Sequence, residues 1–187
     1  MLIETHAARV RKAVRTVLRR IPVADRRRIE SFVVWARAER EWCLIGVGGR
    51  LDRRSAALMP LYDSTEMQGV PRAQIIFWLP VCRLFSDHAL LGVAAHELAH
   101  AIQATGFRGD WHERMQRRYD AGERDADRIA TNWGFGSQIQ ALRRERRETV
   151  DPFLDAHEDS FVRSIMQKAT IQNEAAGRRM SQLAGGI

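Results

Sequence analysis

Two histidines one helical turn apart, with a glutamate directly after the first, form the segment His96-Glu97-Leu98-Ala99-His100. On an α-helix, positions i and i+4 project from the same face, so one metal ion can contact both imidazoles. Glu97 is displaced by about a third of a turn, where it reaches a water on that ion without being a ligand. The spacing predicts a zinc-binding helix on which Glu97 is the general base.

A helix must carry this segment, and the flanking residues supply one. Ser86 or Asp87 can cap its start, and Gly106 marks its end. Apolar residues recur at helical spacing between them, namely Leu91, Ala94, Ala95, Leu98, Ala101 and Ile102. We therefore expect the helix to bury one side and to turn both histidines toward a cleft. Gly92 leaves room for a neighbouring element to approach.

A third ligand is expected because catalytic zinc sites use three protein ligands and leave one position for water. Asp120 and Glu123 resemble a capping box, and Gly134 suits the end of the helix they would begin. The expected inward stripe of this helix is Glu123, Ala126, Asp127, Ala130 and Trp133. Glu123 would bind the zinc, and Asp127 would accept a hydrogen bond from a ligand imidazole. The alternative is a solvated helix whose charges pair with one another.

The pattern H-E-L-A-H followed by E-x-x-A-D-x-x-A, over about residues 74–136, resembles the gluzincin metallopeptidases. It is most similar to the HtpX-type endopeptidases and the small ImmA/IrrE-like proteins. The resemblance implies His96, His100 and Glu123 as zinc ligands, Glu97 as base and Asp127 as the residue that orients an imidazole. It further implies a helix-rich, zincin-like α+β fold with a small sheet beside the metal-binding helix, and zinc-dependent endopeptidase activity on a protein or peptide substrate. Unlike HtpX-type proteins, this chain carries no candidate membrane span.

Peptide hydrolysis would also need a donor that stabilises the developing oxyanion. Tyr119, His112 and His157 are candidates by type, and Tyr119 is the nearest in sequence to the second zinc helix. An arginine is a further candidate.

Two other function classes stay open: a catalytically silent, zinc-bearing regulatory or binding module, and a peptidase associated with nucleic acid. The second rests on the net charge of +7, which arginine dominates. Acidic residues interrupt the arginine runs and no nucleic-acid motif accompanies them, so a solvated surface is favoured over a nucleic-acid partner.

The 187 residues are expected to form a single domain. The longest apolar stretches fall far short of a membrane span. Because the chain shows no signal-peptide pattern, we expect a cytoplasmic protein with Cys43 and Cys82 as reduced thiols.

The remaining expectations concern individual elements. A basic amphipathic helix is predicted over about residues 3–21, with Val10, Val14 and Leu18 as its apolar face, and a second amphipathic helix over about residues 152–180. Residues 53–72 are expected to be irregular, and residues 107–119 to form the rim of the cleft. The strand at residues 74–79 would, by the resemblance, line the cleft and pair with substrate; the alternative is an interior strand.

Overall fold

The computed structural model describes residues 2–39, 56–61, 72–105 and 119–160, together with residues 163 and 167. The fold is α+β and helix-rich, as predicted from the sequence. The helices are α1 (Leu2–Arg20), α2 (Val23–Phe32), α3 (Leu79–Cys82), α4 (Asp87–Thr105), α6 (Tyr119–Ala130) and α7 (Gly136–Glu145). The segment η1 (Thr131–Phe135) joins α6 to α7 through a kink at Gly134, whose φ is 87°, and η2 (Arg146–Val150) is a π-helical turn after α7. The strands are β1 (Val33–Glu39), β2 (Ala56–Leu61) and β3 (Arg72–Trp78).

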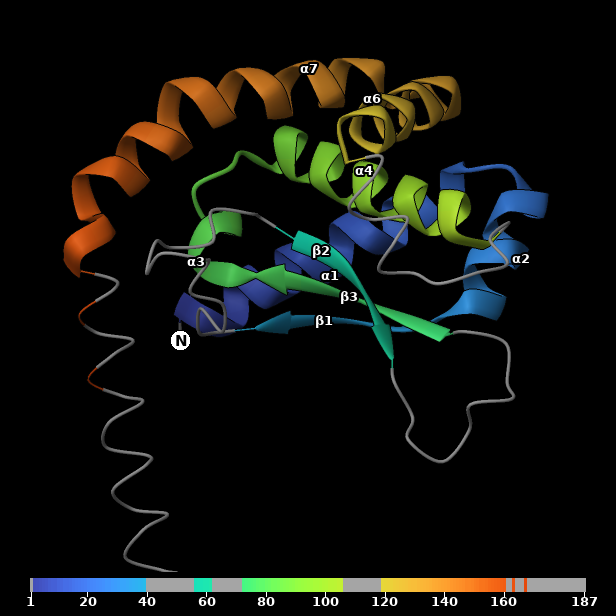
Figure 1. The fold of residues 1–187 in the computed structure, drawn as a ribbon, viewed down its shortest axis with the longest axis horizontal. Helices are drawn as coiled ribbons and strands as arrows, with labels where there is room; N and C mark the ends of the chain where they lie inside the picture. Colours follow the sequence, from blue (N-terminus) through green and yellow to red (C-terminus); the bar gives the residue numbers. More distant parts are fainter. Residues whose placement is uncertain are drawn as a thin grey trace, which may run out of the picture.

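Helix α4, which carries the two histidines, lies at the centre of the molecule. It contacts α1, α2, α6, α7 and β2. Figure 1 shows α6 and α7 on one side of α4 and the sheet on the other. No helix within the described ranges combines the length and apolarity that crossing a membrane requires.

The sheet has three strands in the order β1-β3-β2, with β3 parallel to β1 and antiparallel to β2. The sequence placed a strand at residues 74–79, and β3 covers most of it, but β3 is central and paired on both edges. Pairing of substrate with β3, expected from the resemblance, is therefore wrong, and the interior-strand alternative holds. The expectation of irregular structure over residues 53–72 is wrong for residues 56–61, which form β2, and for Arg72, which begins β3; the rest of that range lies outside the described residues. Pro60 within β2 obscured this strand, and proline is tolerated because β2 is an edge strand.

The burial of α4 differs from the one-sided pattern that the sequence predicted. Buried residues occur all round the helix: Ala89, Leu90, Gly92, Val93, Ala94, Ala95, His96, Glu97, Leu98, Ala99, Ala101 and Ala104. Most of these side chains are small, which allows neighbouring elements to approach from several directions. Two positions counted as part of the apolar face, Leu91 and Ile102, are only partly buried.

Helix α7 fixes the position of α4 at its start. The Ser86 hydroxyl accepts a hydrogen bond from the Ala89 backbone N–H at 3.1 Å, which makes Ser86 the N-cap. The same hydroxyl donates to Glu145 Oε1 at 2.7 Å, and the Ser86 backbone N–H donates to Glu145 Oε2 at 2.8 Å. The predicted start of this helix is thus confirmed, with a partner on α7 that no local pattern indicated.

Helices α1 and α7 also depart from their predicted patterns. The buried face of α1 is Val10, Ala13 and Val17, and Ile21 just after the helix is buried too, while Val14 and Leu18 are only partly buried. The chain is helical from α7 through η2 to residue 160, so Pro152 lies inside a helix that it was expected to open. Proline lacks an N–H, and the π-helical turn immediately before Pro152 accommodates the missing hydrogen bond. The predicted 152–180 helix is described as far as residue 160; from residue 161 on, only residues 163 and 167 of it are described.

The close contact between α4 and α7 gives a stability prediction. A Cβ built on Gly92 would lie 2.4 Å from the Gln138 carbonyl oxygen, which is backbone and cannot move aside as a side chain can. Gly92→Ala should therefore lower the free energy of unfolding by about 1–3 kcal/mol, as overpacking does. Gly122→Ala on α6 is the matched control, since no atom of the described residues lies within 4 Å of its Cβ position. Urea unfolding measures both, and equal stability of Gly92→Ala and wild type would contradict the close approach.

Candidate metal centre

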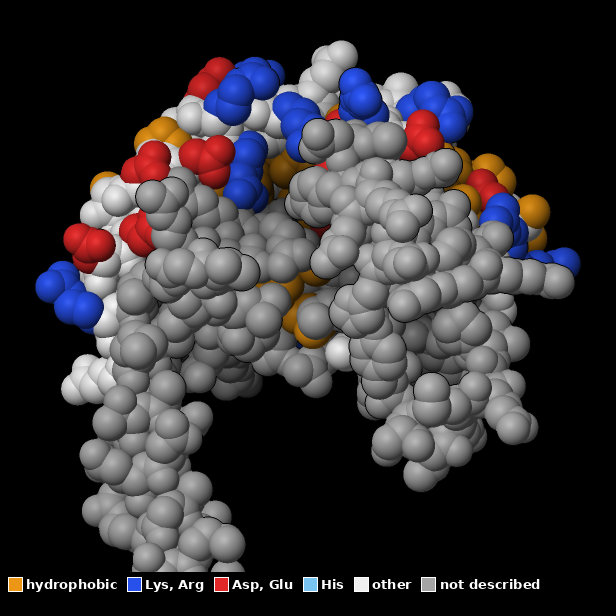
Figure 2. Space-filling view, viewed as in Figure 1, with side chains coloured by type: hydrophobic (Ala, Val, Ile, Leu, Met, Phe, Trp, Pro, Cys, Tyr) orange, Lys and Arg blue, Asp and Glu red, His pale blue; other side chains and the backbone are white. Residues whose placement is uncertain are grey.

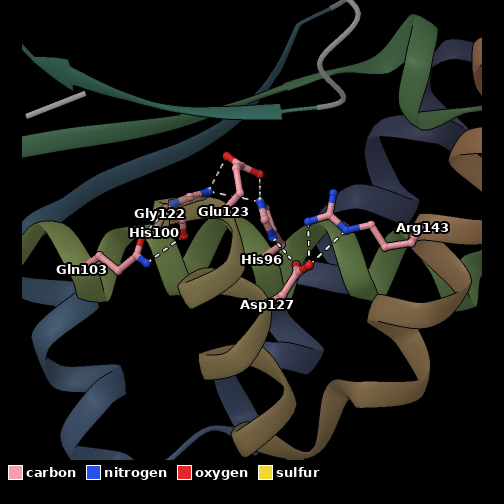
Figure 3. Close-up of polar contacts among 7 residues, drawn as sticks. All are labelled: His96, His100, Gln103, Gly122, Glu123, Asp127 and Arg143. Carbon is pink, nitrogen blue, oxygen red and sulfur yellow. Dashed lines mark hydrogen bonds and ion pairs between the residues drawn. The ribbon is translucent and has the colours of Figure 1, made fainter. Parts of the chain in front are cut away.

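Three side chains from two helices converge on one point. His96 and His100 project from α4 with their rings 4.6 Å apart between centroids and perpendicular, and Glu123 projects from α6 toward both (Figure 3). His96 is buried, and His100 and Glu123 are partly buried. The sequence predicted that these three residues would come together, and the structure places them close enough to hold a metal ion.

One nitrogen of each histidine and the two carboxylate oxygens of Glu123 make the contacts between these three groups, which we call the triangle. His96 Nε2 lies 3.1 Å from His100 Nε2 and 3.0 Å from Glu123 Oε2, and His100 Nε2 lies 3.2 Å from Glu123 Oε1. Ligand atoms arranged tetrahedrally around one zinc ion at about 2.0–2.1 Å lie about 3.3 Å from each other. The observed spacing therefore fits a single small cation contacted by all three groups.

Asp127, one turn after Glu123 on α6, contacts the outer nitrogen of His96. Its Oδ1 lies 2.8 Å from His96 Nδ1, and its Oδ2 accepts hydrogen bonds from Arg143 Nε at 3.0 Å and Arg143 Nη2 at 2.6 Å. A carboxylate oxygen only accepts hydrogen bonds, so His96 Nδ1 carries a proton, and Nε2 is the nitrogen that would bind a metal ion. Arg143 was not identified from the sequence because it stands in the basic run 143–147, which suggested a solvated surface.

His100 has a corresponding partner on its own helix. Its Nδ1 lies 2.8 Å from Gln103 Oε1, and Gln103 Nε2 donates to the Gly122 carbonyl oxygen at 2.9 Å (Figure 3). Because the Gly122 carbonyl only accepts, the amide orientation of Gln103 is fixed with Oε1 toward His100. His100 Nδ1 is then the donor. Sequence reasoning missed Gln103, although its i+3 spacing from His100 was a usable signal.

The electrostatics of the centre call for a cation. Two imidazole lone pairs and a carboxylate point at the same small volume, which is repulsive unless a positive charge lies between them. Burial lowers the pKa of His96, but hydrogen bonds with Asp127 and Glu123 outweigh burial and raise the pKa to about 9. Burial raises the pKa of Glu123, but hydrogen bonds with His100 and His96 outweigh it and lower the pKa well below its usual value. Without a metal, a proton supplies the positive charge.

Glu97 is buried on α4, next to His96 in sequence, with 6% of its surface exposed. Its negative charge contributes to the raised pKa of His96. It also contributes, after burial, to the raised pKa of the Cys82 thiol on α3. Cys82 is buried, and Cys43 lies outside the described residues.

Of the three named oxyanion candidates, the structure describes the side chain of His157 alone. Tyr119 begins α6, but its side chain is not among those described. His112 lies outside the described residues, as do residues 107–118 of the expected cleft rim at 107–119. His157 lies on the helix that follows η2, where its Nδ1 is 2.8 Å from the Phe153 carbonyl oxygen and its ring stacks on Phe153.

The basic residues of α6, α7 and η2 lie among acidic ones. Figure 2 shows Lys and Arg side chains interspersed with Asp and Glu side chains over the upper part of this face. Arg128 pairs with Asp125, Arg143 with Asp127, and Arg146 with Asp151.

Comparison with known proteins adds no family assignment. No protein-family model, no curated protein and no solved structure matches this chain.

The ligand set predicts one metal ion per chain. His100→Ala and Glu123→Ala should each leave less than a full equivalent of metal after dialysis, because two donors hold an ion far less tightly than three. His88→Ala is the matched control, since His88 is exposed in the first turn of the same helix. Elemental analysis of the purified proteins measures the content. Near-full metal in either ligand variant removes that residue from the set.

Asp127→Asn should weaken metal binding by roughly 10–100-fold while preserving the fold, because the amide keeps the volume but gives up the charge that faces His96. Asp125→Asn is the control: Asp125 is exposed on the same helix and pairs with Arg128. Competition with a chelator measures the affinity. Equal affinities of Asp127→Asn and wild type would mean that Asp127 serves only the ion pair with Arg143.

Proposed function

We propose that the chain is a zinc-dependent endopeptidase of the gluzincin type. The observation that carries the proposal is the triangle of His96 Nε2, His100 Nε2 and Glu123 carboxylate oxygens, with Glu97 beside it on α4. Two imidazoles and one carboxylate are a ligand set that catalytic zinc sites use, and they leave a coordination position for water. The sequence resemblance over residues 74–136 supports the same reading.

Zinc, when bound, lowers the pKa of a coordinated water to about 7 and polarises a carbonyl oxygen. The chain's own contribution begins with Glu97, whose carboxylate would accept a proton from the attacking water and return it to the leaving amine. Burial of Glu97 holds this carboxylate in a low-dielectric environment, where its charge acts strongly on neighbouring groups. Asp127 and Arg143 would hold His96 in the orientation that the ligand set needs.

The edge of the sheet supports a revised mode of substrate binding. Within the described residues β2 pairs only with β3, and β2 contacts α4. In Figure 3, β2 runs along the side of α4 toward which Glu123 projects. An extended peptide that paired with β2, instead of with β3, through main-chain hydrogen bonds would lie beside the metal centre.

Glu97→Gln tests the proposal. The variant should bind metal as wild type does but lose peptide hydrolysis by at least about 100-fold, because an amide cannot accept the water's proton. Digestion of a peptide library, read by mass spectrometry, measures cleavage, and elemental analysis confirms loading. If zinc-loaded wild type cleaves nothing in the library, the chain is better described as a metal-bearing binding module.

A further inference from the structure

We propose that Gln103 is a positioning residue that links the second histidine of the metal centre to the helix that supplies the carboxylate. The inference rests on the metal site of the proposed function and adds how that site is assembled. Its basis is the chain of contacts from His100 Nδ1 through the Gln103 side chain to the Gly122 carbonyl.

The direction of each hydrogen bond in this chain is determined. The Gly122 carbonyl accepts from Gln103 Nε2, so Gln103 Oε1 must face His100 and accept from Nδ1–H. A neutral imidazole with a proton on Nδ1 has its lone pair on Nε2. Gln103 therefore selects the form of His100 whose lone pair points at His96 and Glu123, as the Asp127 carboxylate does for His96.

The acceptor on α6 is adjacent to the third ligand. Gly122 supplies the carbonyl and Glu123 supplies the carboxylate, so one turn of α6 both completes the triangle and holds His100 in place. A displacement of that turn would remove a ligand and release Gln103 together. The metal centre is thus expected to form as a unit when α4 and α6 dock.

Gln103 is not needed to terminate α4. The last turn of α4 is closed by Thr105, whose hydroxyl donates to the Ile102 carbonyl oxygen at 2.8 Å and accepts from Arg28 Nη2 at 2.7 Å. The amide of Gln103 instead turns toward α6 and His100 (Figure 3). A role in orientation accounts for both of its contacts, whereas a helix cap accounts for neither.

The experiment uses the full-length, zinc-loaded protein and compares three variants. Gln103→Met keeps the length and volume of the side chain but cannot accept from His100. Gln103→Glu keeps an acceptor for His100 Nδ1–H and gives up the donor to Gly122. Asp125→Asn changes an exposed residue of α6 that pairs with Arg128, outside this chain of contacts, so it serves as the control for changes on α6.

Two readouts are measured: zinc affinity by chelator competition, and the slowly exchanging Nδ1–H proton of each ligand histidine by NMR. Gln103→Met should lose the His100 signal, keep the His96 signal and bind zinc roughly 10–100-fold more weakly. Gln103→Glu should restore the His100 signal and most of the affinity, and Asp125→Asn should behave as wild type does.

The inference is overturned if Gln103→Met keeps both the His100 signal and wild-type affinity. It is also overturned if Gln103→Met and Gln103→Glu lose affinity equally, because Gln103 would then act only through packing. Neither readout depends on peptide cleavage. A zinc-binding protein without peptidase activity would therefore defeat the proposed function while these measurements still decide the role of Gln103.

Discussion

The arrangement around the metal centre depends on one constraint: two imidazoles and one carboxylate, which repel one another as electron-pair donors, must be held close together. His96 Nε2, His100 Nε2 and the Glu123 carboxylate lie 3.0–3.2 Å from one another. Asp127 and Gln103 contact the Nδ1 atoms of the two histidines, which turns both Nε2 atoms inward. Such an arrangement is stable only around a cation, because unpaired donors in a partly buried site are costly. The surrounding helices hold the donors in place against this repulsion. A bound cation would attract all three donors and become their common ligand-binding centre.

Helix α7 supplies no ligand, but its contacts hold α4 and the first ligand in position. Its Gln138 carbonyl packs against Gly92, and its last residue, Glu145, binds the capping Ser86 of α4. Between them on the same helix, Arg143 binds the outer oxygen of Asp127, whose inner oxygen faces His96. One helix thus sets the position of α4 and, through an ion pair, the orientation of its first ligand.

Local spacing explains what the sequence could predict. The i+4 pair of histidines, the i+4 relation of Glu123 and Asp127, and the capping Ser86 all depend on helical geometry that a few residues determine. The partners that were missed depend on tertiary structure. Gln103 acts through a main-chain carbonyl at Gly122, which has no sequence signature, and Arg143 is one of several similar arginines. The edge strand β2 was missed because Pro60 argues against a strand unless its edge position is known. Burial all round α4 likewise reflects contacts with α1, α2, α6, η1, α7 and β2, which the periodicity of α4 alone does not indicate.

X-ray absorption spectroscopy at the metal edge of the purified, full-length protein tests most directly whether His96, His100 and Glu123 bind one zinc ion. If they do, the spectrum shows a four-coordinate zinc ion with nitrogen and oxygen neighbours at about 2.0–2.1 Å and the multiple-scattering pattern of two imidazoles. Sulfur neighbours at about 2.3 Å, or a six-coordinate ion surrounded by oxygen, would contradict it, since neither arises from two histidines, one glutamate and a water.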